Sequence, residues 1–216
     1  MLTFERFHIN DLIWKMATDE KYLKPLASFR KRVAYANAFR TDFPVPTETA
    51  AFLHSASRHP HEIVEEHSNE FSGLVVGCFT TDKKENALKQ DETRKNLRDD
   101  LENMSVSLDS LGWKKIFVDL RGEIPVGVNL SLWKDKSSGY LQTLKEKEVV
   151  ESRDLASTFA SVDDKKFNVP LGHNMICAHS RNRFRTLVNR GGRPVIDKLA
   201  KDMVEDILSW DVDIQM

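Results

Sequence analysis

The most constraining feature of the sequence is an amphipathic segment that runs directly into a strand-like segment. Apolar residues recur at alternating spacings of four and three, at Leu97, Leu101, Met104, Leu108 and Leu111. This spacing places them on one stripe of an α-helix, of the kind that packs on a sheet. Gly112 then suits the left-handed conformation that ends a helix, and residues 113–120 are rich in apolar strand formers. The sequence therefore predicts a helix, a glycine cap and a core strand over residues 97–120.

Helical and strand-like patterns alternate along the rest of the chain. Strands are predicted at residues 33–37, around 62–66 and over 72–80, and helices over 7–29, around 140–147 and over 152–159. Asp19 is a candidate helix cap, and Pro25 is expected to break or bend the helix that follows it. After Pro194 the apolar residues return at helical spacing up to Leu208. Alternation of this kind predicts the α/β class.

Composition narrows the classes of protein. The chain has 216 residues, enough for one domain, and its 32 basic residues nearly balance 33 acidic ones. This balance gives no electrostatic reason to expect nucleic acid or a membrane surface as a partner. No apolar run reaches the roughly 20 residues of a membrane helix. Cys78 and Cys177 lie in apolar, strand-like runs, so we expect buried thiols in a reducing compartment, with the cytoplasm as the predicted location.

An acid and a histidine each follow a strand-like segment. Asp42 lies in a proline-rich loop after residues 33–37, and His173 lies in a predicted loop further along the chain. A histidine takes up and returns a proton near neutral pH, and a carboxylate behind it fixes its tautomer. The order of acid before histidine matches the acid–base half of a serine hydrolase triad. Asp119, at the end of the strand predicted over 113–120, is the alternative acid.

The nucleophile of such a triad is not found in the expected motif. Gly73 and Gly77 have the Gly-x-Ser-x-Gly spacing, but the residue between them is Val75. The single serine before Asp42 is Ser28, in a helix-like segment without a glycine nearby. We therefore expect the chain to be the C-terminal part of an esterase, with no significant esterase activity by itself.

Four short segments support this interpretation by resemblance. They are Met-Ala-Thr-Asp at 16–19, Phe-Arg-Lys-Arg-Val-Ala-Tyr-Ala-Asn at 29–37, Leu-Gly-Trp-Lys-Lys at 111–115 and Gly-His-Asn at 172–174. Together they resemble the DUF676 family of serine esterases, which are lipase-like α/β-hydrolases. The resemblance implies that residues 1–216 are the C-terminal portion of one hydrolase domain. The implied sheet is mostly parallel and flanked by helices, and the nucleophile-bearing N-terminal part is absent.

The resemblance also implies the roles of particular residues. Asp42 corresponds to the triad acid and His173 to the triad histidine. The implied substrate is a carboxylic ester or a lipid, and no cofactor is implied. Residues 121–165 are interpreted as a possible insertion or lid-like excursion, whose apolar part would include Leu130, Leu132 and Trp133.

Other functions stay open. A non-catalytic binding or scaffold protein derived from a hydrolase would use a protein partner to cover an exposed sheet edge. A weaker alternative is a metal site or a nucleic-acid contact. We interpret the histidines as part of a solvated loop rather than a zinc site; they are His54, His59, His61 and His67. The arginines between 181 and 193 are interpreted as solvated side chains beside a helix stop at Gly191-Gly192.

Overall fold

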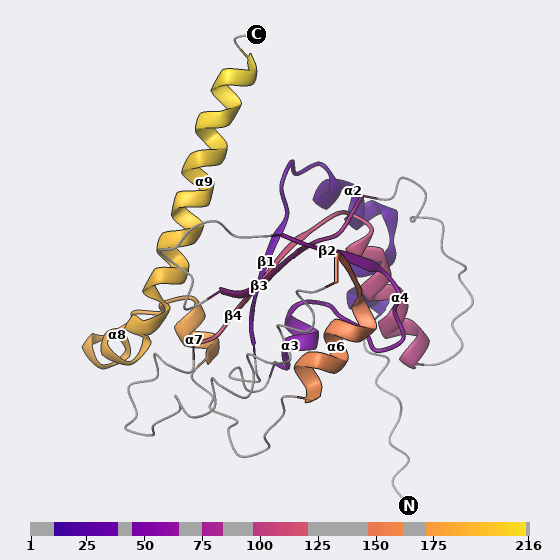
Figure 1. The fold of residues 1–216 in the computed structure, drawn as a ribbon, viewed down its shortest axis with the longest axis horizontal. Coiled ribbons are helices and arrows are strands. Elements are labelled where there is room, and N and C mark those ends of the chain that lie inside the picture. The colour runs from indigo at the N-terminus through magenta and orange to yellow at the C-terminus, as the bar shows by residue number, and fades with distance from the viewer. Residues whose placement is uncertain are drawn as a thin grey trace, which may run out of the picture.

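A five-stranded sheet organises the part of the chain that the computed structural model describes, which is residues 11–38, 45–64, 75–83, 97–120, 147–161 and 172–214 (Figure 1). The strands lie in the order β1-β4-β3-β2-β5. Their bounds are β1 Val33–Asn37, β2 Pro60–Ile63, β3 Val75–Thr80, β4 Lys114–Val118 and β5 Val149–Glu151.

Strand direction differs from the expectation. β1 pairs parallel to β4, whereas β4 with β3, β3 with β2 and β2 with β5 are all antiparallel. The mixed α/β class is confirmed, but the mostly parallel sheet is wrong for the described strands. Alternating helices and strands do not fix direction by themselves. The connection from β3 through α4 to β4 is long enough to reach either end of the neighbouring strand.

Helices cover both faces of the sheet. Their bounds are α1 Asp11–Thr18, α2 Glu20–Ala27, α3 Thr47–Ala50, α4 Leu97–Asp109, α6 Ser152–Ser161, α7 Gly172–Ile176, α8 Arg183–Asn189 and α9 Arg193–Ile214, with a short 3₁₀ helix, η3, at Arg190–Gly192. In Figure 1, α3 and α6 lie together, and α7, α8 and α9 form a separate group on the other side. No described helix is long and apolar enough to cross a membrane.

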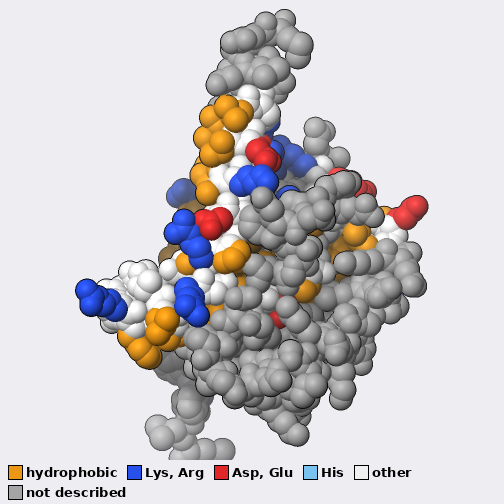
Figure 2. Space-filling model, turned by 60° about the vertical axis from the view of Figure 1, so that its left-hand side comes forward, with side chains coloured by type: hydrophobic (Ala, Val, Ile, Leu, Met, Phe, Trp, Pro, Cys, Tyr) orange, Lys and Arg blue, Asp and Glu red, His pale blue; other side chains and the backbone are white. Residues whose placement is uncertain are grey.

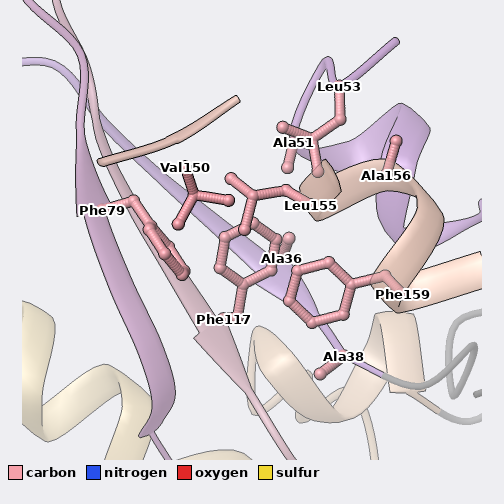
Figure 3. Close-up of a cluster of buried hydrophobic side chains, with 10 residues drawn as sticks. All are labelled: Ala36, Ala38, Ala51, Leu53, Phe79, Phe117, Val150, Leu155, Ala156 and Phe159. Atoms are coloured by element: carbon pink, nitrogen blue, oxygen red, sulfur yellow. The ribbon is translucent and has the colours of Figure 1, made fainter. Parts of the chain in front are cut away.

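One face of the sheet carries an aromatic core (Figure 3). Phe117 of β4 stacks on Phe159 of α6 with ring centroids 4.3 Å apart, and meets Phe79 of β3 edge to face at 5.7 Å. Val150 of β5 and Leu155 of α6 complete this contact and are fully buried. Residues 147–161, within the excursion expected from the sequence, therefore contribute a strand and a helix to the core.

The opposite face carries a second, smaller core. Ile116 and Val118 of β4 pack there with Cys78 of β3, and the covering residues are Met175 of α7 and Val195 of α9. Successive strand residues point to opposite faces, so Ile116 and Val118 share this face and Phe117 points to the other. β4 is buried on both faces from Lys115 to Val118, which fits its apolar run Ile116-Phe117-Val118.

Several local predictions are confirmed. β1 has the predicted bounds, and α4 is followed by Gly112 with φ of +78° and then by β4. Asp19 caps α2 by accepting a hydrogen bond from the Lys21 backbone N–H. Pro25 lies inside α2, which ends two residues later.

Two burial predictions are wrong. The apolar stripe predicted over residues 97–111 is buried only at its end, where Leu111 is 3% exposed, whereas Leu101 is 46% exposed. The buried residues within α4 are instead the polar Ser105, Ser107 and Asp109. Cys177 is exposed in the turn after α7, although Cys78 is buried as expected and both thiols are free. The burial of these residues cannot be predicted from their sequence neighbours, because it depends on which other element each of them packs against.

Candidate functional site

The candidate catalytic edge is the shared C-terminal end of the parallel strands β1 and β4. Asn37 is opposite Val118 in the register, and the Ala38 backbone N–H donates to the Val118 carbonyl at 2.8 Å. The chain then leaves this edge toward Asp42, which lies outside the described residues. Asp119, the alternative acid, follows Val118 directly and is 1% exposed.

Helix α7 brings the backbone of His173 to the same edge. α7 contacts β1, and its Met175 is fully buried against Val118 and Leu120 at the end of β4. His173 therefore lies in a five-residue helix rather than in the predicted loop. The structure thus places the backbone of His173 and the start of the Asp42 loop at one edge of the sheet.

A glycine contact fixes the position of α7. A Cβ atom added to Gly192 would lie 1.4 Å from the carbonyl oxygen of Met175, so only glycine permits this approach of η3 to α7. The turn after α7 is held as well, because the His179 N–H donates to the Asn174 carbonyl and the Asn189 side chain donates to the His179 carbonyl. The arginines of this region, Arg181, Arg183, Arg185, Arg190 and Arg193, are exposed, as predicted.

The aromatic face also holds a buried polar cluster that the sequence analysis missed. It consists of Lys115 on β4, Asp109 at the end of α4 and His61 on β2, each of them 0% exposed. Lys115 Nζ lies 2.5 Å from Asp109 Oδ1 and 3.0 Å from His61 Nε2. Nζ is also 4.1 Å from the ring centroid of Phe52, a favourable cation–π distance. The sequence does contain one signal for this cluster. Side chains alternate along a strand, so Lys115 lies on the same face of β4 as Phe117.

Burial perturbs the proton equilibria of all three groups. Desolvation lowers the pKa of His61 to about 3, with a further decrease from the charge of Lys115. Desolvation raises the pKa of Asp109 to about 6 and lowers that of Lys115 to about 8, and the attraction between the two partly offsets both shifts. At neutral pH the cluster therefore contains an ammonium–carboxylate pair and a neutral imidazole, whose Nδ1 lies 3.0 Å from the His59 carbonyl oxygen.

The histidine interpretation needs correction. His59 is 6% exposed and His61 is fully buried, so the segment is not a solvated loop. Its burial follows from the position of β2 between β3 and β5. His67 lies outside the described residues, and within those residues no group of three or more His, Cys, Asp or Glu side chains could hold a metal ion.

Comparisons with protein-family models, with curated proteins and with solved structures find no match for this chain. The functional argument therefore depends on the residues and their arrangement.

Proposed function

We propose that this chain carries the acid–base half of a lipase-like serine esterase, with Asp42 as the acid and His173 as the base. The serine would come from polypeptide outside residues 1–216. The substrate class is a carboxylic ester, including lipid esters, and the chemistry requires no cofactor.

One observation carries the proposal. α7 contacts β1 and packs on the end of β4, which puts the His173 backbone at the edge where the chain leaves β1 for Asp42. Asp42 is four residues beyond Ala38, so an extended chain carries it at most about 14 Å from this edge. That reach is compatible with a carboxylate behind the imidazole, which is the arrangement that the chemistry needs.

The proposed residues have defined roles in ester hydrolysis. The imidazole of His173 accepts the serine hydroxyl proton while the serine oxygen bonds to the ester carbonyl carbon. The imidazolium then donates this proton to the departing alkoxide, leaving an acyl-serine. A water molecule, deprotonated by the same imidazole, releases the acid and restores the serine. Asp42 stabilises the imidazolium in both steps.

The acid–histidine pairing can be tested on this chain without the serine. We expect the pKa of His173, followed by NMR titration of the ring, to fall by about one unit in Asp42→Asn, because a nearby carboxylate favours the imidazolium. Asp119→Asn is the matched control and should leave that pKa unchanged. A decrease with Asp119→Asn alone would assign the acid to Asp119. No change with either variant would contradict the proposal.

A non-catalytic binding protein is the alternative function. The observation that favours it is the exposed apolar side of α9, where Ile207 and Leu208 are 58% and 60% exposed. The titration separates the two functions, because a binding protein has no need to pair His173 with either carboxylate.

A further inference from the structure

Positive charge is concentrated around helix α8. Basic and acidic residues nearly balance over the whole chain, but residues 165–196 contain seven lysines and arginines and no aspartate or glutamate. The described part of this segment exposes five arginines, which are Arg181, Arg183, Arg185, Arg190 and Arg193. Arg193 pairs with Asp197, whereas no carboxylate of the described residues pairs with the other four. The surface around α8 therefore carries a local excess of positive charge.

Two apolar side chains are exposed among these arginines. Phe184 is 74% exposed, the highest value of any large apolar side chain in the described part of the chain, and Leu187 is 54% exposed. Their spacing of three places them on one side of α8. Figure 2 shows orange apolar and blue basic side chains together at this end of the molecule, and Figure 1 shows α8 at its outer corner. We call this region the α8 surface; it consists of Arg181, Arg183, Phe184, Leu187 and Arg190.

Contacts at both ends hold α8 in place. Asn182 caps the helix by accepting a hydrogen bond from the Arg185 backbone N–H at 2.9 Å. At the other end Asn189 is 3% exposed, and its side chain donates to the His179 carbonyl at 2.7 Å. All residues from 181 to 187 are nevertheless exposed. The α8 surface is thus presented by a fixed helix, so binding to it costs little ordering of the backbone.

A bilayer with anionic headgroups matches both properties of the α8 surface. Guanidinium groups bind phosphate oxygens, and each basic residue near an anionic leaflet strengthens association by about fivefold. Apolar side chains such as Phe184 and Leu187 are buried at the boundary between headgroups and acyl chains. Nucleic acid also binds arginines and stacks on aromatic rings, but it offers no apolar phase for the aliphatic Leu187. The combination of charges and apolar side chains therefore favours lipid.

We propose that the α8 surface docks on membranes that contain anionic phospholipids. Phe184 and Leu187 enter the boundary between headgroups and acyl chains, and the arginines around them contact lipid phosphates. The attachment is peripheral, because two apolar side chains reach only this boundary. It is independent of the proposed esterase chemistry, since neither Asp42 nor His173 takes part.

Flotation of the full chain with lipid vesicles tests the proposal. We expect the wild type to float with phosphatidylcholine vesicles that contain about one-third phosphatidylserine, and to bind pure phosphatidylcholine vesicles about tenfold or more weakly. Phe184→Ser should weaken binding to the anionic vesicles about tenfold, because this ring no longer leaves water. Phe184→Trp should keep the binding, since indole rings favour the membrane boundary. Phe29→Ser, the matched control, changes a phenylalanine that is 62% exposed after α2 and should leave the binding unchanged.

Charge removal tests the role of the arginines. Arg183→Gln/Arg190→Gln should weaken binding to the anionic vesicles by about 25-fold, at about fivefold for each arginine. Lys21→Gln/Lys24→Gln removes the same net charge from exposed positions of α2, away from α8 in Figure 1, and should change the binding little.

Three results would overturn the proposal. The first is a wild-type chain that does not float with the anionic vesicles. The second is an equal loss of binding in the α8 variants and in their controls, which would place the lipid contact elsewhere. The third is a chain that binds poly(U) RNA but not the vesicles, which would assign the arginines to nucleic acid. None of these results bears on the titration of His173.

Discussion

At the scale of single residues, one fully buried ammonium group lies directly against a fully buried carboxylate. Lys115 and Asp109 are both 0% exposed, and their side chains lie 2.5 Å apart. Removing one member of a buried pair leaves the other as an uncompensated charge, which costs far more than removing both. The pair therefore fixes the end of α4 to β4 rather than adding much net stability.

Replacement of Lys115 should destabilise the fold strongly. Lys115→Met is expected to lower the free energy of unfolding by about 3–5 kcal/mol in urea titrations, because Asp109 loses its partner. Lys114→Met, at the half-buried position beside it in β4, is the control and should cost less than about 1 kcal/mol. The double variant Lys115→Met/Asp109→Leu should recover most of the loss. Equal losses in the single and double variants would show that packing, not charge pairing, holds this contact.

His61 and Asp109 should also make opposing contributions to the pH dependence of the free energy of unfolding. The folded pKa of His61, about 3, is below its unfolded value of about 6.5, so its contribution to stability is present above pH 6.5 and is lost as the pH falls. Asp109, with its pKa raised to about 6, has the opposite effect between pH 6 and 4, because the folded state binds its proton more tightly. The two contributions largely cancel in the wild type over that range.

Removing Asp109 should therefore expose the histidine effect. In Asp109→Asn, the free energy of unfolding is expected to fall by about 2 kcal/mol between pH 7 and pH 5, whereas in the wild type it should fall by less than about 1 kcal/mol. Urea titrations at the two pH values measure this. Asp154→Asn, at a half-buried position of α6 away from the cluster, should keep the wild-type pH dependence. The same dependence in Asp109→Asn and the wild type would mean that His61 does not stay neutral in the folded chain.

At the scale of elements, α7 is the piece whose position decides the candidate site. It has only five residues, too few to form a stable helix alone, so its place depends on contacts with β1, β4 and η3. The closest of these contacts is the approach of Gly192 to the Met175 carbonyl. The backbone of His173 is thus positioned by residues distant from it in the sequence.

Gly192→Ala should displace α7. The added Cβ would lie 1.4 Å from a backbone oxygen, and we expect a loss of about 1–3 kcal/mol in the free energy of unfolding together with shifted NMR signals of His173. Gly77→Ala is the control, because its Cβ meets only the outer ring atoms of Phe79, the nearest at 2.9 Å, and leaves the α7 contacts intact. Unchanged His173 signals in Gly192→Ala would mean that η3 moves instead of α7.

At the scale of the whole molecule, the two faces of the sheet are covered by different groups of side chains. One face holds the aromatic core and the Lys115 cluster, and the other carries α7 and α9. The candidate catalytic edge lies on the second side, beside a helix whose apolar side faces outward. The candidate catalytic edge and the exposed apolar side of α9 are therefore neighbouring but separate surfaces.

The sequence by itself determined the local elements. β1, the cap at Asp19 and the succession of α4, Gly112 and β4 all follow from contacts between residues close together in the chain. Asp42 and His173 could be chosen as candidates from their residue types, but Asp42 lies outside the described residues. Their pairing therefore stays a prediction.

Only the tertiary structure decided strand direction, the buried side of α4 and the outward side of α9. It also paired Lys115 with Asp109 and His61, three residues that no spacing rule connects. The physical reason is the same in each case. A helical stripe or an alternating strand shows which residues share a side, whereas the partner that covers this side is set by long-range packing.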